Sequence, residues 1–179
     1  VKANNLTDCY VRPAFYMMGG LGLNMDAYST EVGIAAWEWG AYLGEEALEK
    51  GVRMAVSSLT RLHPNVHPTK AKAAGNYVNS IMAKTLAHRT GFDDAIMLDP
   101  EGYVSEGSGM NLFVVRNEVI YTPYRATILE GITRASVITI AKDLGYTLVE
   151  EPLVRDQLYI ADEIFCCGTA AEVTAVREV

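Results

Sequence analysis

Four short stretches carry groups whose types and spacing could do chemistry. In TKAKAAGNYVNS (69–80), Lys70 and Lys72 precede a turn with Tyr77 close by. A lysine at a turn from strand to helix, partly withdrawn from water, can attack an aldehyde and form a Schiff base. The alternative is a pair of solvated lysines at a helix entrance. The two lysines would point the same way along a strand, so direction does not separate them.

The other three stretches offer a carboxylate and two sets of backbone donors. Glu106 lies in GYVSEGSGMNLF, where the neighbouring glycines would let a ring approach closely, although it could also be a solvated turn residue. Gly131, Ile132 and Thr133 lie at an expected helix start, whose free N–H groups can bind phosphate, or where Thr133 is an ordinary N-cap. Residues 168–170, in CGTAAEV, could bind another anion or form a simple β-turn.

The composition indicates a folded globular protein. The chain has 179 residues, half of them hydrophobic, and a net charge of −7. Without a basic stripe, nucleic acid is a poor partner. No apolar run reaches the length of a membrane span, and Asp8 and Arg12 interrupt any signal-peptide core, so we expect no membrane partner and a cytoplasmic location. Cys166 and Cys167 fit a reducing compartment as small core residues.

Metal and nucleotide sites are not expected. His63 and His67 have i,i+4 spacing, but the proline after each of them rules out a regular helix that would place both rings on one face. Neither a G-x-G-x-x-G before a helix nor a G-x-x-x-x-G-K-[ST] motif occurs. The candidate chemistry therefore rests on the four stretches above.

The pattern predicts a mixed α and β chain with two clear helices. One runs through 76–91, with an apolar stripe formed by Val78, Ile81, Met82 and Leu86. The other runs through 131–147, with Thr133 as N-cap and Gly145 as its end. Strands are expected at 9–17, 53–59, 94–99, 102–108, 111–116, 119–123 and 163–168, and an exposed loop at 17–30.

Taken together, the four stretches match one cofactor. A Schiff-base lysine, a carboxylate that faces a ring, and two anion seats are what pyridoxal 5′-phosphate needs, since it has an aldehyde, a pyridine nitrogen and a phosphate. The set is more specific than any of its members.

The sequence also resembles the branched-chain amino acid aminotransferases, in the fold type IV group of pyridoxal phosphate enzymes. The matching stretches, in family order, are YVRP, WGAYLG, KAAGNYVNS, EGSGMNLF, GITR and ADEIFCCGTAAEVTAV. The resemblance implies an α+β, D-amino acid aminotransferase-like fold with a β-rich large domain flanked by helices. It places the end of the small α/β domain at 1–41, a linker at 42–49 and the large domain at 50–179. It also implies a fragment, without the family's N-terminal part and C-terminal end.

The resemblance assigns cofactor roles by position in these motifs. It makes Lys72 the catalytic Schiff-base lysine and Lys70 a neighbour. Tyr77 would bond the ring oxygen, and Glu106 would pair with the pyridine nitrogen and keep it protonated. The phosphate would be held by Ile132 and Thr133, with the Thr169 hydroxyl.

Substrate roles are implied in the same way. The N–H groups of Thr169 and Ala170, with Tyr10, would receive the α-carboxylate, and Arg12 would meet the side-chain carboxylate of glutamate. The apolar part of the pocket would be lined by Trp39, Tyr42 and Tyr77. The loop 17–28 would place Gly22 and Leu23 at a partner's site, which implies a homodimer.

The implied reaction is transamination between leucine, isoleucine or valine and 2-oxoglutarate, so the partners would be amino acid and 2-oxo acid substrates. Two alternatives stay open. One is another fold type IV enzyme, a D-amino acid aminotransferase or an aminodeoxychorismate lyase. The other is a truncated chain without catalysis.

Overall fold

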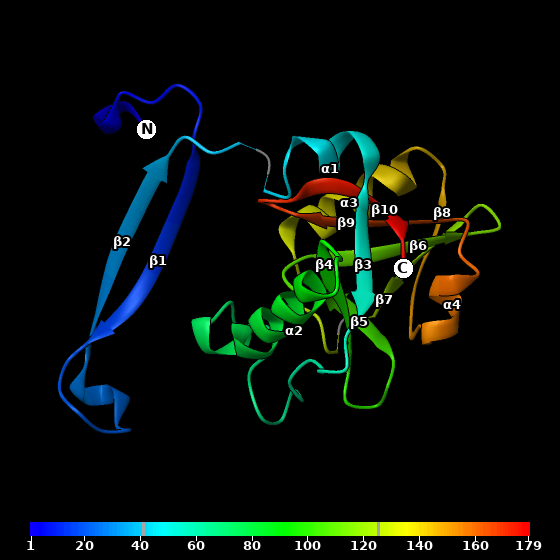
Figure 1. Cartoon of the computed structure of the whole chain (residues 1–179). Coiled ribbons are helices and arrows are strands. Elements are labelled where there is room, and N and C mark those ends of the chain that lie inside the picture. The colour runs from blue at the N-terminus through cyan, green and yellow to red at the C-terminus, as the bar shows by residue number, and fades with distance from the viewer. Residues whose placement is uncertain (41, 125) are drawn as a thin grey trace. The chain divides into compact units, whose positions relative to one another are not determined.

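The chain forms two compact units, Val1–Tyr42 and Leu43–Val179, which are described separately. The computed structural model describes residues 1–40, 42–124 and 126–179 (Figure 1). Within the described helices, none is long and apolar enough to cross a membrane.

The first unit is a long antiparallel hairpin. Strand β1 (Tyr10–Met18) pairs with β2 (Ser29–Trp37), with Tyr10 opposite Trp37. Two short 3-10 helices, η1 (Lys2–Asn4) and η2 (Met25–Ala27), complete it. The sequence pattern predicts β1 correctly but does not predict β2, and the expected loop is shorter because both strands extend into it.

The second unit is built on one eight-stranded mixed sheet. Its strands are β3 (Val52–Val56), β4 (Asp94–Leu98), β5 (Val104–Gly107), β6 (Asn111–Arg116), β7 (Val119–Pro123), β8 (Thr147–Glu151), β9 (Glu163–Gly168) and β10 (Glu172–Glu178). They lie in the order β5-β4-β3-β10-β9-β6-β7-β8. The sheet curls, because β5 also contacts β6 and a bridge joins Val104 to Leu153, which follows β8.

In the described part of this unit, four helices and one 3-10 helix accompany the sheet. They are α1 (Glu45–Lys50), η3 (Ala74–Tyr77), α2 (Val78–Arg89), α3 (Ile132–Asp143) and α4 (Arg155–Tyr159). Helix α1 packs on β10, α2 on β4, and α3 on β8 and β9 (Figure 1). The expected linker range, 42–49, thus contains most of α1, and Ala47 packs in the core of the second unit. The division of the whole protein into domains stays a prediction.

The main core fills the inside of the curled sheet. It is formed by buried apolar side chains that include Val52, Met54, Ile96, Leu112, Val114, Leu153 and Cys166. Cys167 faces the opposite side of β9, against Phe113 and Ile138, because successive strand residues point to opposite faces. Both cysteines are fully buried, which confirms the prediction that they are core residues. Burial raises the pKa of the Cys167 thiol to about 11 and raises that of Cys166 as well.

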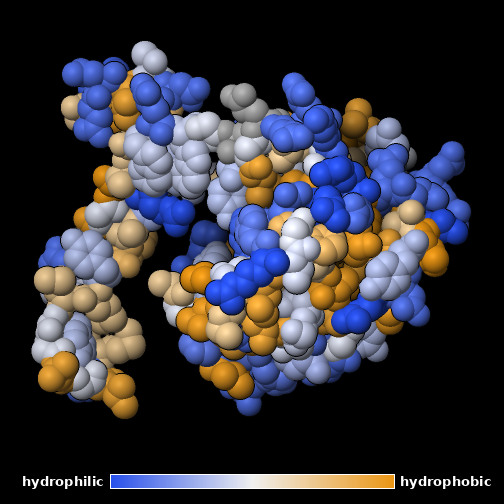
Figure 2. All heavy atoms as spheres, viewed as in Figure 1, coloured by the Kyte–Doolittle hydropathy of each residue, from blue (hydrophilic) through white to orange (hydrophobic). Residues whose placement is uncertain are grey.

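Helix α2 packs on the sheet with its small residues rather than its large ones. Ala83 and Ala87 lie against Ala95 and Met97 of β4, so helix and strand approach closely. The large apolar side chains are exposed: Val78, Ile81, Met82 and Leu86. Apolar surface therefore shows over this helix (Figure 2). The helix is where the sequence predicts it, but its apolar stripe faces away from the sheet.

The N-cap of helix α3 lies two residues before the predicted cap. The N-cap is Gly131, whose carbonyl accepts the first helical bond from Ala135 at 3.0 Å, so the prediction of Thr133 as N-cap is wrong. The reason is a close contact. A Cβ at position 131 would collide with Asn111 Oδ1, so a larger residue there would have to displace the Asn111 side chain, which favours glycine at this N-cap. At the other end, Gly145 follows with a φ of +83°, as predicted.

The close approach of α2 to β4 predicts how substitutions there affect stability. Ala83→Leu should lower the free energy of unfolding by about 1–3 kcal/mol, because the added atoms have no space against the sheet. Thr85→Leu, an exposed position on the same helix, should change it by less than about 0.5 kcal/mol. Urea unfolding of the three proteins measures both values. Equal midpoints for the two variants would show that α2 packs on another face.

Candidate active site

The residues predicted to hold a cofactor gather at one end of the sheet of the second unit. Glu106 lies near the end of β5, and a methyl group on Gly168, at the end of β9, would lie 3.7 Å from the Gly109 carbonyl oxygen in the turn between β5 and β6. The segment 126–131, which leads to α3, is bonded to β5 through Ser105 and Thr127. Segments far apart in the sequence therefore meet at this end.

Lys72 lies in the segment before α2, with its amine directed to a tyrosine. Its Nζ donates a hydrogen bond to the Tyr77 hydroxyl at 2.8 Å and lies 5.4 Å from the centre of that ring. The side chain is exposed in this chain, as in the alternative of a solvated lysine. The Lys72 charge nevertheless acts on Glu106, which places the amine and the carboxylate in the same neighbourhood.

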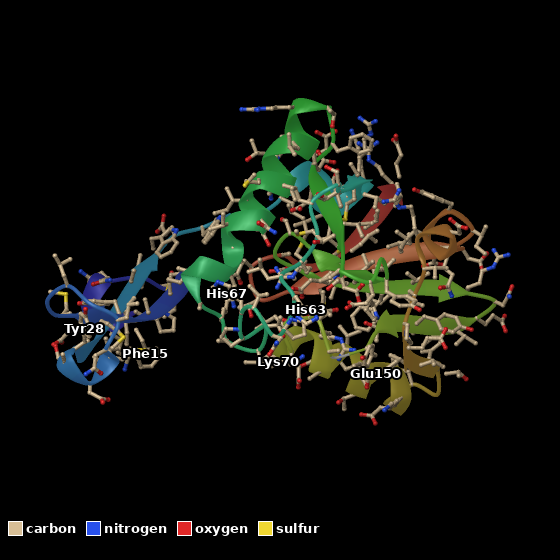
Figure 3. The ribbon with its side chains drawn as sticks, turned by 90° about the horizontal axis from the view of Figure 1, so that it is seen from below. Phe15, Tyr28, His63, His67, Lys70 and Glu150 are labelled. Carbon is tan, nitrogen blue, oxygen red and sulfur yellow. The ribbon has the colours of Figure 1, made fainter. Side chains whose placement is uncertain are left out.

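Lys70 has a different environment. Its Nζ donates to the Ile128 carbonyl at 3.0 Å and lies 3.5 Å from a Glu130 oxygen. It lies in the same segment as His63 and His67, between β3 and α2 (Figure 3). Lys70 thus links this segment to the chain that leads into α3, whereas the amine of Lys72 lies beside Tyr77.

Glu106 is a buried carboxylate with three hydrogen-bonding neighbours. Arg61 Nη2 lies 2.7 Å from its Oε1, and both side chains are buried. The Asn111 amide and the Leu129 N–H each donate to its Oε2, both at 3.1 Å. A carboxylate has about four acceptor positions, so about one remains for a further donor such as a ring N–H.

Two opposing effects set the protonation of Glu106. Burial raises its pKa to about 7, because the charged form loses its water. Arg61, the Leu129 N–H, Lys72 and Lys70 act in the opposite direction. A cation that bound beside Glu106 would also act to lower the pKa of this carboxyl and so favour its ionised form.

The two predicted anion-binding segments are each connected to the surroundings of this carboxylate. The N–H groups of Ile132 and Thr133 lie in the first turn of α3, where they have no partner within the helix. Leu129, whose N–H binds Glu106, is three residues before Ile132. Thr169 and Ala170 form the turn between β9 and β10, next to the β5–β6 turn. A group with both an anionic and a ring-nitrogen end suits this arrangement.

The predicted substrate residues of the first unit form a cluster of their own. The Tyr10 and Trp39 ring centroids are 4.5 Å apart, and those of Trp39 and Tyr42 are 6.1 Å apart. The Arg12 guanidinium carbon lies 5.5 Å from the centre of the Tyr10 ring. The hairpin thus combines one cation with a group of aromatic rings. Phe15 and Tyr28 mark the same hairpin in Figure 3.

Sequence reasoning misses three residues of these two groups. Arg61 lies in a polar stretch that shows no pattern, and its partner Glu106 is distant in the sequence. Asn111 enters the sequence analysis only as part of the EGSGMNLF motif. Trp37 stacks 5.3 Å from Trp39 and belongs to β2, the strand that the pattern does not predict. A polar residue at the first position of a strand, followed by four apolar residues, is the available signal for Asn111.

Comparison with known proteins shows the family of the chain. A family model described as Amino-transferase class IV matches residues 1–179. The chain belongs to this family. Among curated class IV members, it is 52% identical over 180 residues to the branched-chain-amino-acid aminotransferase of Pseudomonas aeruginosa, covering 100% of this chain and 59% of that protein. It is 50% identical over 182 residues to the enzyme of that name from Escherichia coli K12, with the same coverage.

Solved structures of class IV members confirm the fold. The Escherichia coli branched-chain amino acid aminotransferase superposes with a TM-score of 0.94 at 49% identity, over 99% of this chain and 60% of that one. The enzyme of the same name from T.th., solved with pyridoxamine 5′-phosphate, gives 0.93 at 55% identity, over 99% and 59%. The expected α+β, fold type IV architecture is therefore correct. The chain spans about three fifths of the length of these relatives.

The raised pKa of Glu106 predicts a pH-dependent stability. The folded protein keeps this proton up to about pH 7, while the unfolded chain loses it near 4.5, so the carboxyl stabilises the fold less as pH rises through that window. The difference in unfolding free energy between wild type and Glu106→Gln should therefore fall by up to about 3 kcal/mol from pH 4.5 to 7.

Denaturant unfolding at a series of pH values measures this difference. Glu49→Gln, which removes an exposed carboxylate from α1, is the matched control and should run parallel to wild type. If Glu106→Gln also ran parallel, burial would not perturb this carboxyl.

Proposed function

We propose that the whole protein is a branched-chain amino acid aminotransferase. It would transfer the amino group of leucine, isoleucine or valine to 2-oxoglutarate, giving a branched 2-oxo acid and glutamate. The observation that carries the proposal is the buried Glu106 carboxylate, held by Arg61 and acted on by the Lys72 charge, next to the start of α3. The names of relatives about half identical to this chain support the same reaction.

The residues fit pyridoxal 5′-phosphate part for part. The Lys72 amine suits the aldehyde, the Tyr77 hydroxyl the ring oxygen, and Glu106 the pyridine nitrogen. The free N–H groups of Ile132 and Thr133 suit the phosphate, and the Thr169 hydroxyl lies in the neighbouring turn. When bound, this cofactor withdraws electrons from the bond between Cα and hydrogen of the amino acid.

Each residue then has a defined task. Lys72 Nζ attaches the cofactor and, when free and unprotonated, takes the proton from the substrate Cα. Tyr77 orients that nitrogen through the bond at 2.8 Å. Glu106 keeps a proton on the ring nitrogen, because a nearby negative charge favours the protonated ring. Arg61 favours the ionised form of Glu106 and so supports this task.

Substrate recognition is assigned to backbone N–H groups and to side chains. The N–H groups of Thr169 and Ala170 would bind the α-carboxylate that all substrates share, with Tyr10. The aromatic cluster, with Trp39 and Tyr42, suits branched apolar side chains. Arg12 lies beside the Tyr10 ring and would receive the second carboxylate of glutamate.

A homodimer in the cytoplasm is part of the proposal. Two surfaces support the dimer: the exposed apolar stripe of α2, and the hairpin loop 17–28, in which Leu21 and Leu23 are fully exposed. The three free cysteines fit a reducing compartment.

The first test is an absorbance spectrum of the chain with pyridoxal phosphate. We expect a visible band that leucine bleaches, and borohydride reduction followed by peptide mapping should place the label on Lys72. Lys72→Ala should lack the band, and its turnover of leucine should fall by at least about 10³-fold, because it loses both the attachment and the proton carrier.

Lys70→Ala is the control and should keep the band. The lysine assignment would be wrong if Lys72→Ala kept the band and Lys70→Ala lacked it. A band that D-alanine bleaches and leucine does not would instead favour a D-amino acid aminotransferase. No band with wild type would contradict cofactor binding by this chain.

The dimer has its own test. Ile81→Asp places a charge in the exposed stripe of α2 and should shift the sedimentation equilibrium towards monomer by at least about tenfold in dissociation constant, since a buried unpaired charge is costly at an interface. Thr139→Asp, an exposed position on α3, should have a smaller effect. A monomeric wild type would contradict the proposed dimer.

A further inference from the structure

Asn111 occupies a junction that the reaction described above leaves unexplained. It is the first residue of β6 and is buried. Its Nδ2 donates two hydrogen bonds, to Glu106 Oε2 at 3.1 Å and to the Leu129 carbonyl at 2.9 Å. Its Oδ1 lies against the Cα of Gly131, the N-cap of α3, where even a methyl group would collide with it.

Asn111, Glu106 and the backbone of Leu129 form a closed ring of hydrogen bonds. The Leu129 N–H donates to the same Glu106 oxygen that Asn111 binds, and the Leu129 carbonyl accepts from Asn111. The peptide group on each side of Leu129 is therefore fixed relative to the carboxylate. On the other side, Arg61 holds Oε1 and also donates to Ser80 of α2 at 3.0 Å.

We propose that Asn111 is a positioning residue that fixes the Glu106 carboxylate relative to the N-terminus of α3, and so sets the spacing between the groups that bind the ring nitrogen and the phosphate of the cofactor. The proposal rests on the proposed function. A cofactor with a rigid ring benefits when both of its seats are held at one distance before binding, because less freedom is lost on association.

The chemistry of the site explains why asparagine is suited to this position. A single amide nitrogen supplies both donors, which neither serine nor alanine can do. Aspartate would place a second negative charge beside Glu106 and would have no donor for the Leu129 carbonyl. The charged groups that act on Glu106 are Arg61, Lys72 and Lys70, all cations, so Asn111 is its neutral anchor.

The test first uses the chain without cofactor. Asn111→Ala removes a donor to the charged form of Glu106, so the pKa of Glu106, followed by carboxyl NMR, should rise. The amide hydrogen of Leu129 should exchange at least about tenfold faster, because its acceptor is no longer held. Gly131→Ala adds a methyl group that collides with the Asn111 side chain, so it disturbs the same contact and should give the same two changes. This second variant decides the proposal if Asn111→Ala does not fold.

Ser105→Ala is the matched control. It removes two bonds from β5 to the same segment, to the Thr127 carbonyl and hydroxyl, without touching Glu106. It should leave the pKa of Glu106 and the exchange of Leu129 unchanged. If Asn111→Ala behaved like Ser105→Ala in both measurements, the proposal would be overturned.

A binding experiment then tests the spacing. Wild type should bind pyridoxal phosphate more tightly than pyridoxal, and in Asn111→Ala this preference should shrink at least about fivefold, while binding of inorganic phosphate stays the same. An unchanged preference would overturn the proposal. If wild type bound none of the three ligands, the proposed function would fail, and the two cofactor-free measurements would decide the role of Asn111 alone.

Discussion

The buried ion pair of Arg61 and Glu106 is the interaction on which the candidate site depends. A carboxylate withdrawn from water is costly unless charges and donors surround it. Here the guanidinium comes from the segment after β3, one donor from the start of β6, and another from the chain before α3. Keeping one charge therefore requires three distant segments to meet. The curled sheet allows this, because it brings β5 back against β6.

Local chemistry makes part of this structure predictable. Strands β4, β6, β7 and β9 are short apolar runs between turn residues, and Gly91 and Gly145 mark helix ends, so their places follow from the sequence. Lys72 and Glu106 stand out as candidates because glycines and a tyrosine lie beside them. The start of α3 is harder to place, because the cap is decided by the contact of Gly131 with Asn111, which no local pattern reveals.

The remaining differences also come from tertiary contacts. Arg61 cannot be matched to Glu106 from the sequence, because the pairing depends on how the chain returns to the sheet. The large apolar residues of α2 identify it as a helix, yet close packing on β4 selects its alanines. Strands β8 and β10 carry several charged residues and are held mainly by their neighbours in the sheet. A single sequence shows where a helix forms more clearly than which side it buries.

The buried thiols of β9 have a practical consequence. Cys166 and Cys167 are inaccessible, and burial keeps them in the unreactive protonated form, with the Cys166 sulfur 3.5 Å from that of Met54. Cys9, the remaining cysteine, is partly exposed and precedes β1. A maleimide dye or spin label would thus attach to the hairpin unit alone. The chain carries a natural handle for spectroscopy, and no cysteine needs to be removed to use it.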